Sequence, residues 1–237
     1  ETIVPTSAKW IEENLGIKER RIALPNQTTS DLAAEAGKKA IENAGLKPDD
    51  IELIIVATAT PDRLAPSTAA IVQDKLKAYN SVAFDLAAVC SGFLFGISTA
   101  SQFIATSVYN NALIIGADTF SKIIDWSRRD CVFFGDGAGA AVLFHTETDG
   151  GFLAFRLYTD GRGKWNFTIP GGGSEFPLSH ENVDAGYRYF QMIGRAVYET
   201  GVKVLPKAIF QVLKDTGLSI DDIDYMIPHQ PSIKILK

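Results

Sequence analysis

Cys90 is the first candidate for nucleophilic chemistry, because of its place between two predicted elements. An apolar run that ends near Asp85 predicts a strand, and the apolar run after Cys90 predicts a helix. A thiol at the start of a helix lies beside unpaired backbone N–H groups and the positive end of the helix dipole, which lower its pKa. The pattern predicts a nucleophilic cysteine, with an inert buried thiol as the alternative. The residues that follow are small enough for a substrate to approach closely: Ser91, Gly92 and Gly96.

His229 is the second candidate, because it follows a predicted buried strand at residues 224–227. α/β folds place their ligands at the carboxyl ends of strands, and Pro228 and Pro231 stiffen the loop around this histidine. The alternative is a hydrogen-bonded structural histidine. Neither of the other two histidines is expected to be catalytic, because one closes a strand before a charged turn and the other lies in a polar segment: His145 and His180.

A glycine-rich stretch at residues 135–139 (GDGAG) invites a dinucleotide-binding interpretation. That motif needs a helix after it, whereas residues 140–144 predict a strand. We therefore expect a hairpin turn between strands at 131–134 and 140–144, with Cys131 in the core and residues 171–173 in a flexible surface loop. No cluster of His, Cys or acidic residues has metal-ligand spacing, so no metal site is expected.

Alternating strands and helices must position these candidates, which is an α/β pattern. Further strands are predicted at 53–57, 82–85, 112–116 and 152–158. Helices are predicted at 32–43, 66–77, 91–107 and 204–216, with Pro66 in the first turn of the second.

Two segments of the chain resemble each other at an offset of 172 residues. Residues 45–55 (GLKPDDIELII) and 217–227 (GLSIDDIDYMI) share six identities and one Asp/Glu match, and each follows an amphipathic helix. The repeat predicts a duplicated fold with an N-terminal half at 1–150 that carries Cys90, and a C-terminal half at 151–237 that carries His229. Measured against the first copy, the second lacks roughly 79 residues at its end and the first roughly 20 at its start, so we expect a truncated second half.

Composition sets outer limits on the function. The 237 residues are 46% hydrophobic and 22% charged, which excludes a disordered chain. A net charge of −5 argues against a broad nucleic-acid-binding surface, so no nucleic-acid partner is expected. Two cysteines favour a reducing compartment, and the apolar stretch 91–109 carries too many polar residues for a membrane span. We expect a cytoplasmic protein without a membrane partner.

Four stretches resemble the β-ketoacyl-acyl carrier protein synthase III family, a branch of the thiolase-like condensing enzymes. They are 10–21 (WIEENLGIKERR), 84–93 (FDLAAVCSGF), 131–141 (CVFFGDGAGAA) and 227–231 (IPHQP), in the family order. The resemblance implies a duplicated αβαβα layered fold and a homodimer. It implies acyl-CoA and acyl carrier protein as partners, with a coenzyme A thioester as substrate and no metal or redox cofactor.

The resemblance also implies a two-stage reaction that starts fatty-acid chains. Cys90 would take the acyl group from acyl-CoA, and His229 would stabilise the enolate formed when malonyl-acyl carrier protein loses CO₂. The family's catalytic asparagine lies beyond its His-Gln motif, and a glycine-rich segment lies further on; neither stands in the eight residues after His229. We therefore expect this stretch alone not to be a competent condensing enzyme.

Other positions correspond to the family's binding residues. Trp10 corresponds to a tryptophan that stacks on the coenzyme A adenine, and Arg128 to an arginine near it. Asn14 stands where many members have arginine. Lys234 corresponds to a basic carrier-binding residue, while Glu199 replaces a common lysine, for which Arg195 could compensate one helical turn away. With Arg188 and Lys203, the basic residues among these form a predicted docking patch for an acidic carrier.

Ala65 stands where some members place a phenylalanine that limits the acyl pocket, so a longer or branched acyl group is expected, unless neighbouring residues fill the gap. Two other functions remain open. One is an acyltransferase that uses Cys90 and His229 without decarboxylation, which Asn14 and Glu199 motivate. The other is a non-catalytic partner subunit, against which the presence of Cys90 argues.

Overall fold

The computed structural model describes residues 3–147 and 150–237, which group into two units. Unit 2 comprises residues 21–121 and 135–151, and unit 1 comprises 1–20, 122–134 and 152–237. The two units therefore interleave along the chain and do not coincide with the predicted halves at 1–150 and 151–237. Those halves were inferred from the repeated sequence, and the duplication stays a prediction.

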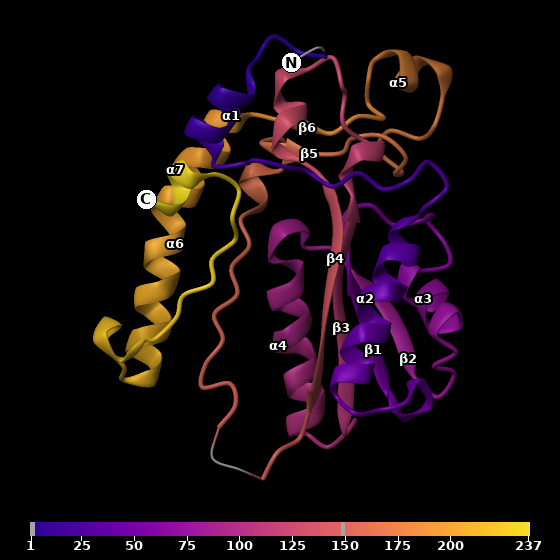
Figure 1. Cartoon of the computed structure of the whole chain (residues 1–237), viewed down its shortest axis with the longest axis vertical. Helices are drawn as coiled ribbons and strands as arrows, with labels where there is room; N and C mark the ends of the chain where they lie inside the picture. The colour runs from indigo at the N-terminus through magenta and orange to yellow at the C-terminus, as the bar shows by residue number, and fades with distance from the viewer. Residues whose placement is uncertain (1–2, 148–149) are drawn as a thin grey trace. The chain divides into compact units, whose positions relative to one another are not determined.

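Unit 2 is built on one four-stranded sheet, with the strand order β2-β1-β3-β4 (Figure 1). Strand β1 (Leu53–Ala57) is parallel to β2 (Val82–Leu86) and to β3 (Asn111–Thr119), and β4 (Asp136–Phe144) is antiparallel to β3. Because the first three strands are parallel, their carboxyl ends meet at one edge of the sheet, here called the carboxyl edge. In register, Ala57 pairs with both Leu86 and Gly116.

Helices cover both faces of this sheet, because alternate residues of the buried strands point to opposite sides. Helices α2 (Thr29–Asn43) and α3 (Thr68–Leu76) share one core cluster with Ile54 and Val56. Helix α4 (Gly92–Ala105) shares a second cluster with Leu53 and Ile55 (Figure 1).

Side chains at the ends of α2 and α3 explain where these helices begin. Thr28 and Asp31 form a capping box at the start of α2. Ser67 caps α3, and the Asp85 carboxylate on β2 accepts the backbone N–H groups of Thr68 and Ala69 at 2.7 Å each. An acidic side chain at a helix N-terminus satisfies orphan donors and complements the dipole. Asp85 thereby ties the start of α3 to the strand that leads to Cys90.

Unit 1 contains α1 (Ala8–Leu15), α5 (His180–Asp184), α6 (Gly194–Thr216) and α7 (Ile233–Leu236), and a two-stranded ladder of β5 (Phe167–Thr168) and β6 (Gln191–Met192). Phe134, Phe167 and Phe190 pack as an aromatic cluster, with ring centroids 4.6–6.4 Å apart. Short 3₁₀ helices complete both units: η1 (Pro48–Asp50), η2 (Val89–Ser91), η3 (Phe120–Lys122), η4 (Arg129–Phe133), η5 (Gly161–Gly163) and η6 (Ile220–Asp222).

The two repeat segments share backbone hydrogen bonds as well as sequence. After α2, Leu46 N–H donates to Ile41 O at 3.1 Å, and after α6, Leu218 N–H donates to Leu213 O at 3.1 Å, the same pair displaced by 172 residues. In both copies a glycine with positive φ ends the helix and a three-residue 3₁₀ helix follows. Shared bonds of this kind support the duplication.

Several predicted elements differ from the structure. Residues 131–134 are not a strand, because 131–133 lie in η4 and Phe134 is its C-cap, although Cys131 is buried as expected with 4% of its surface exposed. The glycines of 135–139 do not make a hairpin turn. Gly137 and Gly139 lie within β4, since β3 runs on to Thr119 and gives them pairing partners. A Cβ atom at either glycine would meet nothing within 4 Å, so close packing does not require glycine at these two positions.

Other predicted strands lack a ladder. Residues 152–158 and 224–227 form no strand in the described chain, because a strand needs a partner and none pairs with them. Helix α6 is longer than predicted, since it begins at Gly194 and continues past Pro206. Pro66 precedes the cap of α3 instead of lying in its first turn. Gly171 is half-buried, and its backbone bonds to Tyr187 at 2.8 Å, so this loop is anchored.

Candidate active site

Cys90 lies at the carboxyl edge of the unit 2 sheet, in the turn between β2 and α4. It is the middle residue of η2, and α4 begins two residues later at Gly92. Its side chain is exposed, whereas the other free cysteine, Cys131, is buried. The predicted position of Cys90 between a strand and a helix is therefore confirmed.

Two glycines bring α4 against the sheet. A Cβ at Gly92 would lie 2.9 Å from the Ala57 Cβ, and one at Gly96 would lie 2.9 Å from an Ile114 methyl carbon. Both distances are shorter than packed carbon atoms allow, so only glycine permits this approach. Gly92 and Gly96 are buried against the sheet, so the expectation that they admit a substrate is wrong, and their small size serves packing.

The backbone before Cys90 is strained. Val89 has a φ of +46°, in the left-handed region that β-branched residues rarely adopt. Such a conformation costs on the order of 1–2 kcal/mol and persists where the surrounding structure holds it. Strain of this kind is concentrated at functional turns, and here it fixes the direction in which the next residue, Cys90, leaves the sheet.

The prediction of a lowered thiol pKa is wrong in direction. Burial raises the pKa of the Cys90 thiol, since protein surrounds the sulfur on the side away from solvent, and the negative charge of Asp118 raises it further. A backbone hydrogen bond at Cys90 itself opposes both effects but does not outweigh them. The free thiol is thus the dominant form near neutral pH.

Asp118 is a functional candidate that sequence reasoning missed, although a charged residue closing the apolar strand β3 was a visible signal. Its Oδ1 atom accepts four hydrogen bonds from the turn after β1, which consists of Thr58, Ala59 and Thr60. Burial raises the pKa of the Asp118 carboxyl, and these hydrogen bonds work in the opposite direction. The turn leads to Ala65, which is exposed on the way to α3.

His229 lies in unit 1, in an irregular segment between η6 and α7. Burial lowers the pKa of its imidazole below 6.5, so the ring is neutral at pH 7. A neutral imidazole has one N–H donor and can hydrogen-bond to a developing negative charge. Ser232, three residues after His229, is buried and is the N-cap residue of α7, which fixes the end of this segment.

Helix α7 joins the histidine segment to α1 within unit 1. The Ile233 Cβ lies 3.2 Å from the position of a Cβ at Gly16, and the Lys234 ammonium donates to the Asn14 side chain at 2.8 Å. Asn14 in turn donates to the Trp10 carbonyl at 2.9 Å. The structure thus brings Trp10, Asn14 and Lys234 together.

The arginine that contacts the Trp10 ring is Arg129, the neighbour of the predicted Arg128. The Arg129 guanidinium carbon lies 4.1 Å from the centroid of the Trp10 ring, within the range of a cation–π contact. Arg128 instead forms an ion pair with Asp130 at 2.7 Å. Adjacent arginines point in different directions in the 3₁₀ helix that begins here, and sequence comparison without geometry could not choose between them.

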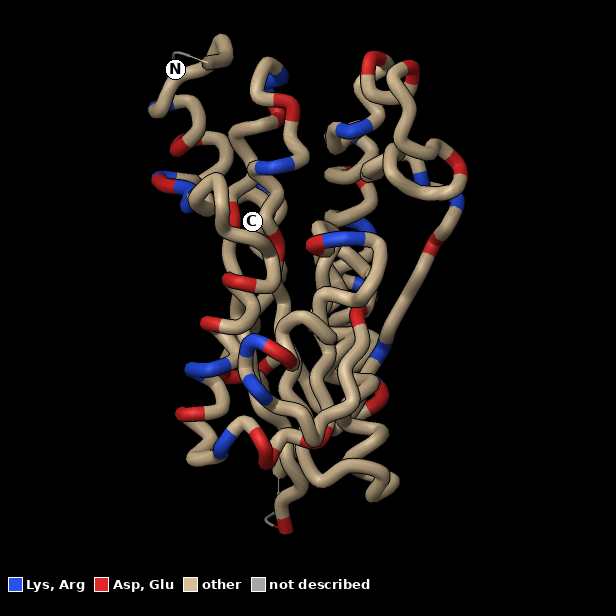
Figure 2. The backbone as a smooth tube through the Cα atoms, turned by 90° about the vertical axis from the view of Figure 1, so that its right-hand side faces the viewer, with Lys and Arg blue, Asp and Glu red and all other residues tan. Residues whose placement is uncertain are grey.

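The predicted carrier patch is only partly free. Arg195 is paired with Glu199 at 2.7 Å on α6, and Lys234 is bonded to Asn14. The Arg188 guanidinium lies 4.5 Å from the Tyr189 ring centroid, and Lys203 is exposed on α6. Figure 2 shows basic and acidic residues interspersed along the described chain. Arg195 was expected to compensate for the lysine that Glu199 replaces, but Glu199 forms an ion pair with it and neutralises its charge.

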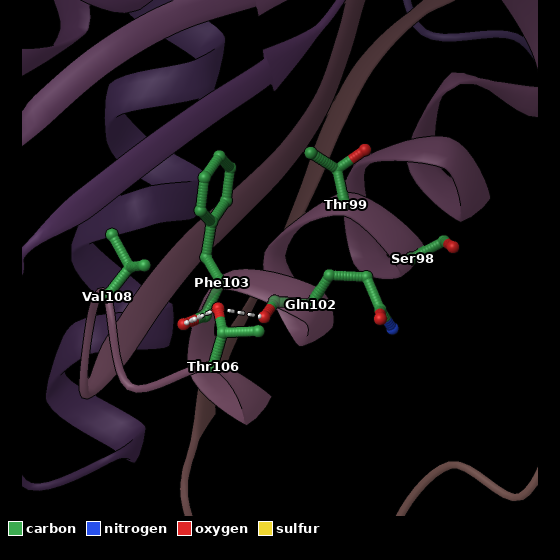
Figure 3. A pocket seen from close by; sticks show the side chains of 6 residues that line it. All are labelled: Ser98, Thr99, Gln102, Phe103, Thr106 and Val108. Carbon is green, nitrogen blue, oxygen red and sulfur yellow. Dashed lines mark hydrogen bonds between the residues drawn. The ribbon is translucent and has the colours of Figure 1, made fainter.

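A shallow depression on α4 does not include Cys90. Its lining side chains come from the C-terminal half of the helix and the residues after it: Ser98, Thr99, Gln102, Phe103, Thr106 and Val108 (Figure 3). None of them titrates near neutral pH, and the Thr106 hydroxyl is occupied by the Gln102 and Phe103 carbonyls. Within residues 3–147 and 150–237, no group of three or more His, Cys, Asp or Glu side chains could hold a metal ion, and no helix is long and apolar enough to cross a membrane.

Comparisons with known proteins place this geometry in a family. The family profile described as 3-oxoacyl-[acyl-carrier-protein] synthase III matches residues 84–161. β-Ketoacyl-[acyl-carrier-protein] synthase III of Caldanaerobacter subterraneus subsp. tengcongensis is 50% identical over 238 residues, which cover 100% of this chain and 72% of that protein. The protein of the same name from Desulfitobacterium hafniense is 46% identical over 237 residues, with the same coverage.

A solved structure extends the likeness to the fold. The crystal structure of 3-oxoacyl-[acyl-carrier-protein] synthase III from Aquifex aeolicus is similar to this chain with a TM-score of 0.88 and 37% identity, over 99% of this chain and 71% of that one. The predicted thiolase-like α/β fold is thereby confirmed. Because identity of this level extends over the whole chain, including the turn of Cys90 and the segment of His229, the chain belongs to the 3-oxoacyl-[acyl-carrier-protein] synthase III family.

Proposed function

We propose that the chain is a β-ketoacyl-acyl carrier protein synthase III, an acyltransferase that starts fatty-acid chains by condensing an acyl group with malonyl-acyl carrier protein. The observation that carries the proposal is the exposed Cys90 at the carboxyl edge of the sheet, at the start of α4, in a chain of this family. No resident cofactor or metal is part of the proposal, and coenzyme A enters as the substrate thioester.

In the first stage, the Cys90 sulfur attacks the carbonyl carbon of acyl-CoA. The bond to the coenzyme A sulfur breaks, coenzyme A leaves as a thiolate that takes up a proton, and an acyl-enzyme remains. The Cys90 backbone N–H lies in the middle of η2, and in this proposal it donates to the oxyanion of the tetrahedral intermediate.

In the second stage, malonyl-acyl carrier protein loses CO₂ and becomes an enolate. The neutral His229 ring donates a hydrogen bond to the thioester carbonyl, where the negative charge develops. The enolate carbon attacks the acyl carbonyl at Cys90, the carbon–sulfur bond breaks, and a β-ketoacyl chain leaves on the carrier. The thiolate of Cys90 then takes up a proton and returns to the resting thiol.

The coenzyme A nucleotide is proposed to bind at the Trp10 ring, with Arg129 as the cationic neighbour. The Trp10 ring and the Arg129 guanidinium lie 4.1 Å apart, and a flat adenine could stack on either of these two planar groups. Asn14 is committed to Trp10 and Lys234 and carries no charge, so phosphate binding here depends on other basic residues.

Two further parts of the proposal concern assembly and place of action. A homodimer is proposed because β2 is an edge strand of the sheet, with Val82 49% exposed, and an unpaired edge is a surface to which a second copy can add a strand. The proposed compartment is the cytoplasm, where two free cysteines remain reduced.

The acyl donor tests the proposal directly. Single-turnover reactions with acetyl-, hexanoyl- and decanoyl-CoA should each add the acyl mass to Cys90, with the longer groups accepted because Ala65 is small. In a protein that also carries the C-terminal segment of its relatives, release of CO₂ from malonyl-acyl carrier protein should follow. A clear preference for the acetyl group contradicts the wide pocket, and acylation without CO₂ release would favour the alternative acyltransferase that transfers to another acceptor.

The charge of Glu199 should limit carrier docking. Glu199→Lys removes the partner of Arg195 and adds a second positive charge on the same face of α6, so association with an acidic carrier should become several-fold faster at low salt. Stopped-flow binding at 20 mM and 500 mM salt measures this effect, which screening should abolish at the higher concentration. Glu181→Lys on α5 makes the same charge change away from α6 and serves as the control. Equal acceleration by both variants would refute a local patch.

A further inference from the structure

Alternate residues of β3 pack against successive positions of α4, from the middle of the helix toward its start. Ile114 faces Gly96, and Gly116 lies under Phe93, whose ring carbon would be 3.5 Å from a Cβ at Gly116. Asp118 is the next residue on the same side of the strand, because side chains alternate with a period of two. Each step along β3 therefore moves toward the N-terminal end of α4, and Asp118 is the residue at the level of the Cys90 turn.

Asp118 also organises the neighbouring turn. One of its carboxylate oxygens accepts the Ala59 N–H at 2.8 Å, the Thr60 N–H at 3.1 Å, and the hydroxyls of Thr58 and Thr60 at 3.1 and 2.9 Å. Thr60 is held further, because its hydroxyl accepts the Thr119 N–H at 2.8 Å. This bonding fixes the turn from which the segment of Ala65 departs.

Hydrogen bonding alone does not explain a carboxylate here. An asparagine could accept the same four bonds through its side-chain oxygen without the cost of burying a charge. Asp118 has no ion pair within the described residues, and no described donor reaches its second oxygen. A half-buried carboxylate without a cation points to a role for the charge itself.

We propose that Asp118 is a positioning residue for acyl transfer, whose fixed negative charge lies beside the Cys90 turn and repels a second negative charge there, and whose hydrogen-bonded oxygen holds the turn leading to Ala65. The inference deepens the proposed function and rests on it. The charge acts by like-charge repulsion, which disfavours the thiolate. That repulsion disappears in the acyl-enzyme, because the thioester is neutral, so the carboxylate favours the acylated state over the thiolate.

Two other carboxylates of the described residues lie near this edge, and both have partners. Asp85 on β2 is engaged by the N-terminus of α3, and Asp62, beyond the turn after β1, accepts from the Ser30 N–H and hydroxyl at 2.9 and 2.6 Å. Only the charge of Asp118 adds to burial in raising the pKa of Cys90. Asp62 therefore offers a matched control that carries the same chemical change without the effect.

The test is the pH profile of Cys90 alkylation by iodoacetamide, read at the Cys90 peptide by mass spectrometry, with no acyl donor present. In Asp118→Asn the pH at the midpoint of Cys90 alkylation should fall, while the four hydrogen bonds to the turn at residues 58–60 can persist. At pH 7 each unit of fall should make alkylation about three- to fourfold faster, because the thiolate fraction rises tenfold while its nucleophilicity drops with a Brønsted slope of about 0.4–0.5. Asp118→Glu should restore the wild-type profile, and Asp62→Asn should leave it unchanged.

An unshifted midpoint in a folded Asp118→Asn protein would overturn the inference, and so would an equal shift in Asp62→Asn. Cys131 reports folding in the same experiment, because it is buried and should stay unlabelled in every folded variant. Should Asp118→Asn fail to fold, Asp118→Ser removes the same charge and takes its place, and a wild-type midpoint below the ordinary thiol value of about 8.5 also contradicts the proposal. Because no donor is used, failure here is distinguishable from failure of the proposed acyl transfer.

Discussion

Cys90→Ser is expected to abolish formation of the acyl-enzyme from acyl-CoA, with a fall in rate of about 10³-fold or more. A hydroxyl at this position has no base within the turn to ionise it, whereas a thiol retains a reactive thiolate fraction even with a raised pKa. Intact-mass measurement after seconds of incubation with acetyl-CoA should show one acyl adduct on the wild-type protein and none on the variant.

The second cysteine provides the control for this result. Cys131→Ser removes the other thiol of the chain but leaves η2 and α4 untouched, so it should acylate at the wild-type rate. Loss of the adduct in Cys131→Ser, or its persistence in Cys90→Ser, would remove the basis of the proposed first stage. Thermal unfolding of both variants separates chemistry from folding.

In a protein that also carries the C-terminal segment of its relatives, His229→Ala is expected to spare acylation and to slow condensation by about 10²–10³-fold, the usual cost of losing one donor to a developing oxyanion. The acyl adduct at Cys90 should therefore accumulate in the presence of malonyl-acyl carrier protein instead of turning over. Quenched-flow mass spectrometry follows both species. His180→Ala, which changes an exposed histidine of α5, should condense normally. Equal loss of acylation and condensation in His229→Ala would contradict a role confined to the second stage.

The same histidine should set the acidic limit of condensation. Burial lowers the pKa of His229 below its ordinary 6.5, so the ring is neutral above that pH and becomes protonated only on further acidification. If the neutral ring is the productive donor, condensation falls on acidification only at a lower pH than an ordinary histidine would cause. His229→Gln keeps an N–H donor but cannot titrate, so its residual activity should lack this limb.

The local sequence pattern was sufficient to predict the elements that are buried in the core. The run Leu53–Ala57 is buried at every position, and a continuous apolar run of that length between polar turns predicts a central strand. Cys90 could be placed for the same reason, since the strand before it and the helix after it are each strongly apolar. The capped start of α3 shows the limit, because Pro66 signals a helix start to within two residues only.

The remaining features depend on contacts between distant residues. Residues 224–227 have the composition of a strand, but a ladder needs a partner that no local pattern reveals. Arg129 rather than Arg128 meets Trp10 because of the rotation of one 3₁₀ turn. The raised pKa of Cys90 arises from burial and from Asp118, which is 28 positions away in the sequence, whereas the helix dipole visible in the sequence predicted the opposite sign.

The interleaved units have a consequence for the order of folding during synthesis. Unit 2 is complete once residue 151 has been made, and its sheet can then close. Residues 1–20, which carry Trp10, belong to unit 1 and find their neighbours in α7 only when residues 233–236 emerge. At 5–20 residues per second, the 86 residues after position 151 take roughly 4–17 s. For that interval the first helix lacks its neighbours in α7, and its apolar residues Ile11 and Leu15 are open to chaperones, proteases and other nascent chains.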